Sequence, residues 1–322
     1  MSTIGVGLIG LGRHGMRYAR HLLGEVPKAR LVAVCRRNAE EGLQFARHYA
    51  LRFFQDYREL IADPQVEAVL VVTVPSLTLP IAREAIRHRK PLLIEKPLAI
   101  HAGDAREIVQ SARSNHVPLM TAQTLRYDAT ILKLKELFPR IGKWQYLQLT
   151  ARMEHRQHSQ AEIQAWENRG VLLEMGIHLL DLTRYLTGDE IREVYCELDH
   201  SGQDTPEDQV WIRLTTQSGL RCFLDVSRVT SYRVTRAEIV AEQGHACADW
   251  AKRRVHLTTD QTQGEEYQVS PTHTLLAVLN DFFQALENDS PMPIPGLDGQ
   301  RAVELAEACY ESAATGCPIK LP

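Results

Sequence analysis

The chain has 322 residues, and its 37 Lys and Arg residues against 40 Asp and Glu residues give a formal net charge of −3 at pH 7. Basic and acidic residues are interspersed, so we expect neither nucleic acid nor a membrane as a partner, because phosphate backbones and anionic lipids require clustered positive charge. A chain of this length is long for a single hydrophobic core. Two domains are therefore predicted.

The six cysteines are dispersed, and their spacing matches neither a disulfide framework nor a metal site. No signal-peptide pattern precedes the first apolar run, which begins at Ile4. No apolar run reaches the roughly 18 to 20 residues that a membrane-spanning helix needs. We therefore expect a cytoplasmic protein without a metal ion.

Short apolar runs alternate with helix-like stretches up to about residue 121. The runs are residues 4–9, 31–34, 68–73, 92–94 and 119–121, and the helix-like stretches include 16–23, 77–88 and 103–115. Continuous apolar strands with helical connections indicate a parallel sheet that is covered on both faces. Residues 1–122 are therefore predicted to form an α/β domain with a doubly wound parallel sheet.

The pattern changes in the rest of the chain. Longer runs with alternating polarity predict strands at residues 144–153, 194–198, 210–215, 221–226 and 237–241, with helices at 131–137 and 172–186. Two further helices are predicted at 274–286 and 300–313, on either side of a proline-rich turn at 291–295. Residues 123–322 should thus form an α+β domain with a large, mostly antiparallel sheet.

A glycine loop, Gly-Leu-Gly-Arg-His-Gly at residues 10–15, follows the first predicted strand. In a βαβ unit the first glycine permits a tight turn, the second lets the backbone approach a pyrophosphate, and the third lets the helix pack on the strand. The helix N-terminus supplies N–H donors. We assign cofactor contacts to Gly10, Gly12, Arg13, His14 and Gly15, the alternative being an ordinary glycine turn.

Arg36 and Arg37 follow the second predicted strand, where an NAD-binding domain carries an acid for the ribose 2′-hydroxyl. Guanidinium groups can instead bind a 2′-phosphate through charge-assisted hydrogen bonds. The sequence therefore favours NADP(H) over NAD(H). The alternative is a pair of solvated arginines.

Lys96 lies in the sequence Glu-Lys-Pro at the end of the predicted strand 92–94. Ligands of open α/β sheets bind beyond the carboxyl ends of the strands, so Lys96 is a candidate for the active site rather than a solvated lysine. Its ammonium group could hydrogen-bond the reacting oxygen of a substrate. We also assign Thr73, Pro75, Glu95 and Lys96 to the cofactor site.

Glu174, His178 and Asp181 share one stripe of the predicted helix 172–186, between two apolar stripes. This arrangement is typical of a general base, His178, with carboxylates that orient it. A buried histidine satisfied by its own helix is the alternative, and a metal site from Glu174 and His178 has no further ligands to support it. The segment 154–158, which contains two histidines, is interpreted as a solvated loop.

These features together resemble the Gfo/Idh/MocA family, the relatives of glucose-fructose oxidoreductase and inositol dehydrogenase. The resemblance rests on the glycine loop, the Glu-Lys-Pro sequence at 95–97, the segment 123–128 and the helix that bears His178 and Asp181. It implies that residues 1–122 form a dinucleotide-binding Rossmann domain and that residues 123–322 form a second domain, which binds substrate and whose open sheet mediates homodimers or homotetramers. NAD(P)-dependent chemistry on sugars or polyols is implied by the same resemblance. It also implies that Lys96 and His178 are the catalytic pair.

Three positions depart from the family pattern. Glu174 occupies a position that is usually aspartate, Arg169 and Gly170 stand where several glycines are common, and Leu79 replaces a histidine. These departures keep Lys96 and His178 but leave the substrate open.

The leading hypothesis is therefore an NADP(H)-preferring oxidoreductase acting on a hydroxyl or keto group of a small molecule such as a sugar or polyol. His178 would be the acid/base, Lys96 would position the oxygen, and Glu174 or Asp181 would orient His178 or bind substrate. Arg126 and Tyr127 would line the cleft, where Lys96 and His178 are expected to converge. A non-catalytic dinucleotide sensor and a reductase of an imine or diol are the alternatives, and retention of Lys96 and His178 favours an enzyme.

Overall fold

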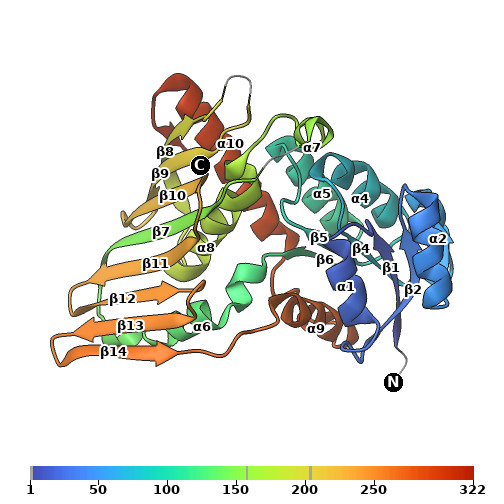
Figure 1. The fold of residues 1–322 in the computed structure, drawn as a ribbon, viewed down its shortest axis with the longest axis horizontal. Coiled ribbons are helices and arrows are strands. Elements are labelled where there is room, and N and C mark those ends of the chain that lie inside the picture. The colour runs from blue at the N-terminus through green and yellow to red at the C-terminus, as the bar shows by residue number, and fades with distance from the viewer. Residues whose placement is uncertain (1–2, 157–158, 203–204) are drawn as a thin grey trace. The chain divides into compact units, whose positions relative to one another are not determined.

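The computed structural model describes residues 3–156, 159–202 and 205–322 (Figure 1). The chain divides into two compact units, Met1–Gln123 with His273–Gln300 and Thr124–Thr272 with Arg301–Pro322. The first division lies next to the expected boundary between residues 122 and 123. The segment His273–Gln300 differs from the expectation, because it belongs to the first unit.

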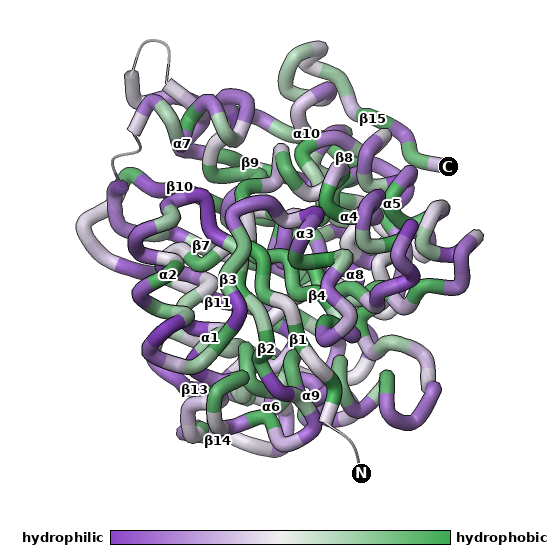
Figure 2. Tube along the Cα trace, turned by 90° about the vertical axis from the view of Figure 1, so that its right-hand side faces the viewer, coloured by the Kyte–Doolittle hydropathy of each residue, from purple (hydrophilic) through white to green (hydrophobic). Residues whose placement is uncertain are grey.

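The first unit contains a six-stranded parallel sheet with the order β3-β2-β1-β4-β5-β6. Its strands are β1 (Ile4–Ile9), β2 (Ala29–Cys35), β3 (Arg52–Phe54), β4 (Ala68–Val71), β5 (Leu92–Glu95) and β6 (Leu119–Ala122). Every residue of β4, β5 and β6 is buried, and Figure 2 shows β2 and β4 as largely hydrophobic. The predicted doubly wound parallel sheet is confirmed.

Helices connect these strands. They are α1 (Gly15–Leu22), α2 (Ala39–His48), α3 (Tyr57–Ala62), η1 (Pro75–Leu77), α4 (Thr78–Arg87) and α5 (Ala102–Ser114). The short elements β3, α2 and α3 were not among the predicted ones. A local signal for α2 does exist, because the side chain of Asn38 accepts a hydrogen bond from the amide of Glu41 and so caps the helix.

The segment that returns to the first unit carries α9 (Thr274–Glu287), which contacts α1 and β6. Glu287 forms an ion pair with Lys28, and the amide of Thr121 donates a hydrogen bond to the carbonyl of Ile294 over 3.1 Å. Phe282 and Phe283 of α9 are fully buried. The helix is therefore part of the core of this unit.

The second unit contains a nine-stranded sheet with the order β14-β13-β12-β11-β7-β10-β9-β8-β15. Its strands are β7 (Trp144–Glu154), β8 (Ile191–Asp199), β9 (Gln209–Thr216), β10 (Arg221–Thr230), β11 (Val234–Ala241), β12 (Gly244–Asp249), β13 (Arg254–Thr259), β14 (Thr262–Gln268) and β15 (Ile319–Lys320). Strands β7 and β10 pair in parallel, and the other neighbouring strands of the described sheet pair antiparallel. The predicted mostly antiparallel sheet is confirmed, although β12 to β15 were not predicted.

The second unit also contains helices. They are η2 (Thr124–Tyr127), α6 (Ala129–Glu136), η3 (Phe138–Arg140), α7 (Gln160–Ala165), η4 (Leu172–Gly176) and α8 (Ile177–Thr187), and α10 spans Gly296–Thr315. Helix α8 contacts β7, and α6 contacts β12 and β13. Side chains alternate between the two faces of a strand. Leu147 and Leu149 of β7 are accordingly buried.

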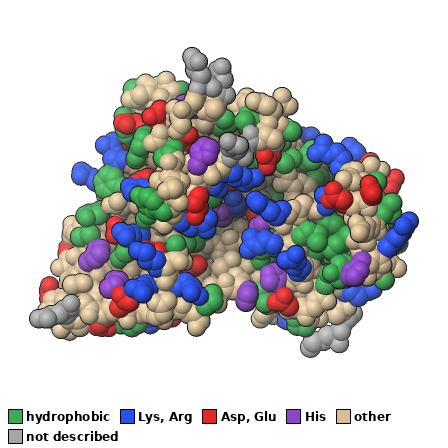
Figure 3. Space-filling view, viewed as in Figure 1, with side chains coloured by type: hydrophobic (Ala, Val, Ile, Leu, Met, Phe, Trp, Pro, Cys, Tyr) green, Lys and Arg blue, Asp and Glu red, His purple; other side chains and the backbone are tan. Residues whose placement is uncertain are grey.

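The other face of this sheet exposes Tyr146, Trp211 and Phe223, which lie on β7, β9 and β10. The rings of Tyr146 and Phe223 contact each other edge to face, with their centres 6.2 Å apart. Charged residues are interleaved with them, for example Arg213 and Asp225. Figure 3 shows basic, acidic and histidine side chains interspersed over the strand-rich unit.

Candidate functional site

The glycine loop of the first unit has the geometry of a dinucleotide-binding turn. Gly10 has a φ of +100°, and a Cβ on it would lie 2.1 Å from the carbonyl oxygen of Val72. A Cβ on Gly15 would lie 1.8 Å from the carbonyl oxygen of Gly10. A Cβ on Gly12, by contrast, would meet no atom within 4 Å. The turn and the packing of α1 thus require the first and third glycines, and the second faces the space that a pyrophosphate would occupy.

Glu95, at the end of β5, is tied to this loop. Its Oε1 accepts hydrogen bonds from the hydroxyl of Tyr18 over 2.6 Å and lies 2.7 Å from Nε2 of His14. Its Oε2 accepts a hydrogen bond from the amide of Lys96 over 2.9 Å. Burial alone would raise the pKa of Glu95, but His14, the charge of Lys96 and the Tyr18 hydroxyl hold that pKa below its usual range.

Tyr18 is fully buried, and the pKa of its hydroxyl is raised well above 10.0 by burial and by the charge of Glu95. It therefore stays a hydrogen-bond donor. His14 was predicted to contact the cofactor, and in the structure its ring contacts Glu95. Because Glu95 precedes Lys96, this network links the glycine loop to the candidate catalytic lysine.

Arg36 also reaches the glycine loop. Its Nη1 donates a hydrogen bond to the carbonyl of Leu11 over 2.8 Å, and its Nη2 forms an ion pair with Glu41. Arg37 and Arg13 are exposed. A carboxylate therefore lies next to Arg36, which sequence reasoning did not consider.

The predicted cofactor residues of the first unit meet at one edge of its sheet. Gly10 follows β1, Arg36 follows β2, Thr73 follows β4 and Lys96 follows β5. The strand ends are in register, since Ile9 pairs with both Cys35 and Val71, and Val71 pairs with Ile94.

Three predicted cofactor residues lie close to this edge. The methyl group of Thr73 lies 3.1 Å from the position that a Cβ on Gly10 would occupy. Pro75 is buried in η1, beyond the same edge. Lys96 is half-buried there.

The helix that carries the candidate acid/base group is not a regular α-helix. Its first turn, η4, has π-helical hydrogen bonding over Leu172–Gly176 and contains Glu174, and the α-helix α8 with His178 and Asp181 follows. The expectation of one continuous α-helix from residue 172 is thus wrong for this turn. Single π turns inside α-helices are frequent at functional sites. His178 is half-buried and Asp181 is buried.

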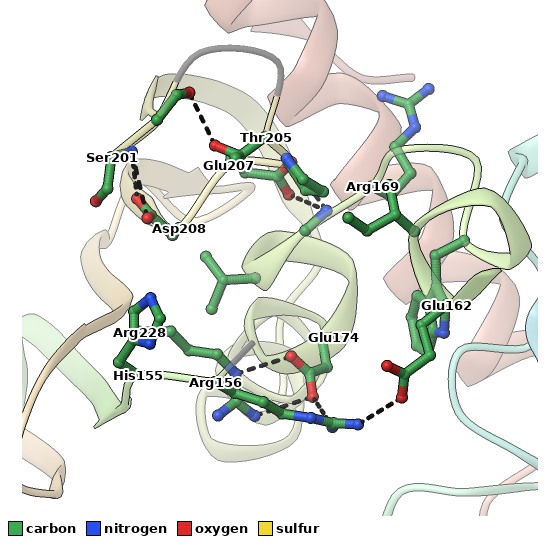
Figure 4. Close-up of a pocket in the computed structure, with 16 residues that line it drawn as sticks. His155, Arg156, Glu162, Arg169, Glu174, Ser201, Thr205, Glu207, Asp208 and Arg228 are labelled. Carbon is green, nitrogen blue, oxygen red and sulfur yellow. Dashed lines mark hydrogen bonds and ion pairs between the residues drawn. The ribbon is translucent and has the colours of Figure 1, made fainter. Parts of the chain in front are cut away.

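Two arginines bind Glu174. Arg228 on β10 donates from Nε to Oε2 over 2.8 Å and from Nη2 to Oε1 over 2.9 Å, and Arg156 donates from Nη1 to Oε1 over 3.3 Å. Arg156 also donates to Glu162 of α7 over 2.9 Å. Figure 4 shows both guanidinium groups converging on the carboxylate of Glu174. Such two-point contacts fix the position of a carboxylate as well as its charge.

An arginine binds Asp181 in the same way. Arg126 of η2 donates from Nε to Oδ2 over 2.8 Å and from Nη2 to Oδ1 over 2.5 Å. Its guanidinium group also lies 5.1 Å from the centre of the Tyr185 ring. Arg126 was predicted to line the substrate cleft, together with Tyr127 in the same short helix. The structure shows that Arg126 anchors η2 to α8.

A pocket of about 550 Å³ opens in the second unit, beside the π turn (Figure 4). Its lining includes Arg156, Glu162, Trp166, Glu174, Glu207 and Arg228. Of the predicted catalytic and substrate residues, only Glu174 is in this lining; Arg126, Tyr127, His178 and Asp181 are not.

His155 and Arg156 are exposed and lie outside any helix or strand, as the interpretation of residues 154–158 as a solvated loop expects, whereas Glu154 is the last residue of β7. His155 and Arg156 line the pocket, and Arg156 binds Glu174. Gln157 and His158 lie outside the described residues. Sequence reasoning also missed Arg228, Trp166 and Glu207. Arg228 is 54 residues away from Glu174 along the chain, and no local pattern marks it as a partner.

The described residues contain neither a metal-binding cluster nor a membrane-spanning helix. In the three ranges given above, three or more His, Cys, Asp or Glu side chains nowhere gather as a metal ion would require. Over the same part of the chain, each helix is too short or too polar to cross a membrane.

Comparison with known proteins places the chain in a family. Residues 4–123 match the model of an oxidoreductase family with an NAD-binding Rossmann fold, and residues 132–247 match the GFO/IDH/MocA C-terminal domain. A myo-inositol 2-dehydrogenase of Thermotoga maritima is 27% identical, with 98% of each chain covered. A 1,5-anhydro-D-fructose reductase of Ensifer adhaerens is 28% identical, with 89% of each chain covered.

A solved structure shows the same likeness. The UDP-N-acetylglucosamine 3-dehydrogenase of Acidithiobacillus ferrooxidans superposes with a TM-score of 0.86 at 25% identity, with 98% of this chain and 99% of that chain covered. The relatives named here are all oxidoreductases. Together with the glycine loop and the strand-end lysine, these matches show that the chain belongs to the GFO/IDH/MocA family of NAD(P)-dependent oxidoreductases that act on CH–OH groups.

Proposed function

We propose that this oxidoreductase interconverts a hydroxyl and a keto group on a sugar, a polyol or a related small molecule, with NADP(H) preferred over NAD(H). The observation that carries the proposal is the common edge of the parallel sheet, where the glycine loop, Arg36 and Lys96 follow strands that are in register. Relatives that act on inositol and on anhydrofructose support the substrate class.

The glycine loop fits a dinucleotide, because Gly12 leaves open the space that a pyrophosphate needs. The pyrophosphate would be held by the start of α1 and by the three glycines of the loop, Gly10, Gly12 and Gly15. The part of the site that holds the nicotinamide ring would be bordered by Thr73, Pro75 and Glu95. When bound, the nicotinamide supplies the hydride chemistry. All other steps fall to the side chains of this protein.

In the oxidation direction, His178 removes the proton from the substrate hydroxyl, and Lys96 hydrogen-bonds the same oxygen as its carbon becomes a ketone. The two residues lie in different units, so their convergence on one oxygen is part of the proposal. The ion pairs with Arg228 and Arg126 fix the positions of Glu174 and Asp181 on the helix that bears His178. The pocket beside Glu174 would receive the rest of the substrate.

Preference for NADP(H) is inferred from Arg36 and Arg37. Arg36 is held at the glycine loop by the carbonyl of Leu11, and Arg37 is exposed beside it. Two guanidinium groups at this position can bind a 2′-phosphate. Glu41, which pairs with Arg36, would have to release Arg36 or share it with the 2′-phosphate.

We further propose that the enzyme is a homodimer or homotetramer that associates through the exposed face of its nine-stranded sheet. Tyr146, Trp211 and Phe223 support this, because aromatic residues are enriched at protein interfaces. The six cysteines are free, in keeping with a cytoplasmic location.

The test is a screen of sugars, polyols and keto-sugars with both phosphorylated and unphosphorylated nicotinamide cofactors, followed by the absorbance of the reduced ring. Turnover of at least one compound that is lost in both Lys96→Ala and His178→Ala would support the proposal. Binding of cofactor without turnover of any compound in the panel would favour the non-catalytic sensor instead. Including imines and diols in the panel tests the remaining alternative.

A further inference from the structure

Glu207 is a buried carboxylate at the start of the helix that bears Glu174 and His178. It is 4% exposed and precedes β9. Its two carboxylate oxygens each accept a hydrogen bond from the amide of Gly170 over 2.9 Å, and Oε1 also accepts from the amide of Leu172 over 3.2 Å. The first amides of a helix lack partners within the helix and attract negative charge. Glu207 supplies both the hydrogen-bond acceptors and the negative charge, from a segment more than 30 residues away in the sequence.

The main chain of Glu207 adds a further contact. The amide of Val171 donates a hydrogen bond to the carbonyl of Glu207 over 2.9 Å. A Cβ on Gly170 would lie 2.0 Å from that same carbonyl oxygen, so only glycine allows this approach. The amides of three consecutive residues therefore all donate to Glu207: those of Gly170 and Leu172 to its carboxylate, and that of Val171 to its main-chain carbonyl.

The next residue, Asp208, contacts the strand that carries Arg228. The carbonyl of Asp208 accepts a hydrogen bond from the amide of Arg228 over 2.8 Å. The side chain of Arg228 in turn binds Glu174. Residues 207 and 208 thus contact both the start of the helix that bears Glu174 and the arginine that binds its carboxylate.

The charge of Glu207 is compensated locally. Burial raises the pKa of Glu207, while the Tyr310 hydroxyl, 2.7 Å from Oε1, and the amides of Gly170 and Leu172 oppose that rise. The pKa of Tyr310 is itself raised well above 10.0 by burial and by the charge of Glu207, so Tyr310 remains a donor. The guanidinium group of Arg169 lies 4.0 Å from the centre of the Tyr310 ring.

We infer that Glu207 is a positioning residue of this enzyme: its carboxylate holds the π turn in place, and through that turn it sets where Glu174 and His178 lie. The inference rests on the proposed function, in which His178 is the acid/base group. It adds a residue that touches neither the reacting atoms nor the cofactor but acts through the helix that does.

The test uses the full-length protein and three variants. Glu207→Gln keeps the size of the side chain but turns an amide group toward N–H donors, and Glu207→Asp keeps the charge on a shorter side chain. Glu197→Gln is the matched control, because Glu197 is an exposed carboxylate on β8 of the same sheet. The readout is the imidazole resonances of His178 in protein with labelled histidine, assigned with His178→Gln. Fluorescence titration with NADPH reports on the first unit.

Glu207→Gln is expected to move the His178 resonances, Glu207→Asp to move them less, and Glu197→Gln to leave them in place. NADPH affinity should stay within about twofold, whereas turnover of a substrate found in the screen should fall about 10- to 100-fold, the scale of a misplaced catalytic group. A merely structural role would lower the thermal midpoint without moving the resonances. Unmoved His178 resonances in a folded Glu207→Gln protein would overturn the inference.

If Glu207→Gln does not fold, Tyr310→Phe replaces it, because that change removes only one hydrogen bond to the carboxylate. Smaller movements of the His178 resonances would then support the inference, and their absence would refute it. Failure of the proposed function looks different: His178→Ala would keep its turnover, whatever the resonances of His178 do in the Glu207 variants.

Discussion

Arg228 and Glu174 form a two-point ion pair, with Nε to Oε2 at 2.8 Å and Nη2 to Oε1 at 2.9 Å. Both side chains are about 15% exposed, so solvent screens the pair only in part. The carboxylate was predicted to act on His178, which follows it by four residues. The structure also places this carboxylate against Arg228 on a strand of the sheet.

Glu174→Gln should therefore weaken turnover less than His178→Ala does, and its main effect should be on the pH profile. Removing negative charge from the turn before His178 disfavours the protonated imidazole, so the acidic limb of the profile should move to lower pH. Turnover measured over a pH series in both proteins tests this. An unchanged profile would show that Arg228 and Arg156 already cancel the charge of Glu174.

His178→Ala should lower turnover by roughly 10² to 10⁴, the contribution typical of one proton-transfer group. Cofactor affinity should be nearly unchanged, because the glycine loop belongs to the other unit. Lys96→Ala should be comparably damaging. The double variant should lose less than the product of the two losses, because both groups act on one oxygen. Steady-state kinetics of the four proteins measure this cycle, and near-full activity of His178→Ala would refute the mechanism.

Arg36→Asp should shift cofactor preference toward NAD(H) by about tenfold or more, because a lost charge-assisted contact costs roughly 1.5 to 3 kcal/mol. Glu41→Gln is the matched variant. It removes the carboxylate that pairs with Arg36, and should tighten NADP(H) binding while leaving NAD(H) nearly unchanged. Fluorescence titrations measure the affinity of each protein for both cofactors. Equal affinities in the unmodified enzyme would contradict the assignment of Arg36 and Arg37.

Arg126→Met should destabilise the protein by roughly 3 to 5 kcal/mol, because it removes one member of a buried ion pair with Asp181. Replacing both residues, as Arg126→Met with Asp181→Leu, should recover part of the loss. The exposed pair of Arg83 and Glu107 is the control, and Arg83→Met should change stability little. Urea unfolding measures all three. A stable Arg126→Met protein with a raised KM would restore Arg126 to the substrate site.

Stability in acid should depend on Glu95. Its pKa is held below the ordinary 4.5 in the folded protein, although burial alone would raise it. A lowered folded pKa contributes stability above the unfolded pKa, and that stability is lost as the pH falls through the folded pKa. Below about pH 4.5 the unmodified protein should thus lose stability more steeply than Glu95→Gln. Thermal midpoints over an acid pH series test this, with the exposed Glu40→Gln as control.

Much of the first unit could be predicted from the sequence. Its strands are short apolar runs, and its glycine loop and the Glu-Lys-Pro sequence lie directly after two of them. Because parallel strands present their carboxyl ends at one edge, strand order along the chain already places Gly10, Arg36, Thr73 and Lys96 on a common edge. The edge strand β3 was missed because only three residues form it.

The tertiary structure alone decided the partners of the charged residues. Periodicity places Glu174, His178 and Asp181 on one helix, but Arg228 and Arg126 reach them from 54 and 55 residues away. The π turn likewise depends on Glu207, which no local pattern connects to residue 170. Hydrophobic periodicity reports which face of an element is buried, because that choice repeats along the chain. Which polar group meets which across the core depends on how distant segments pack, and a single sequence carries no repeating signal for it.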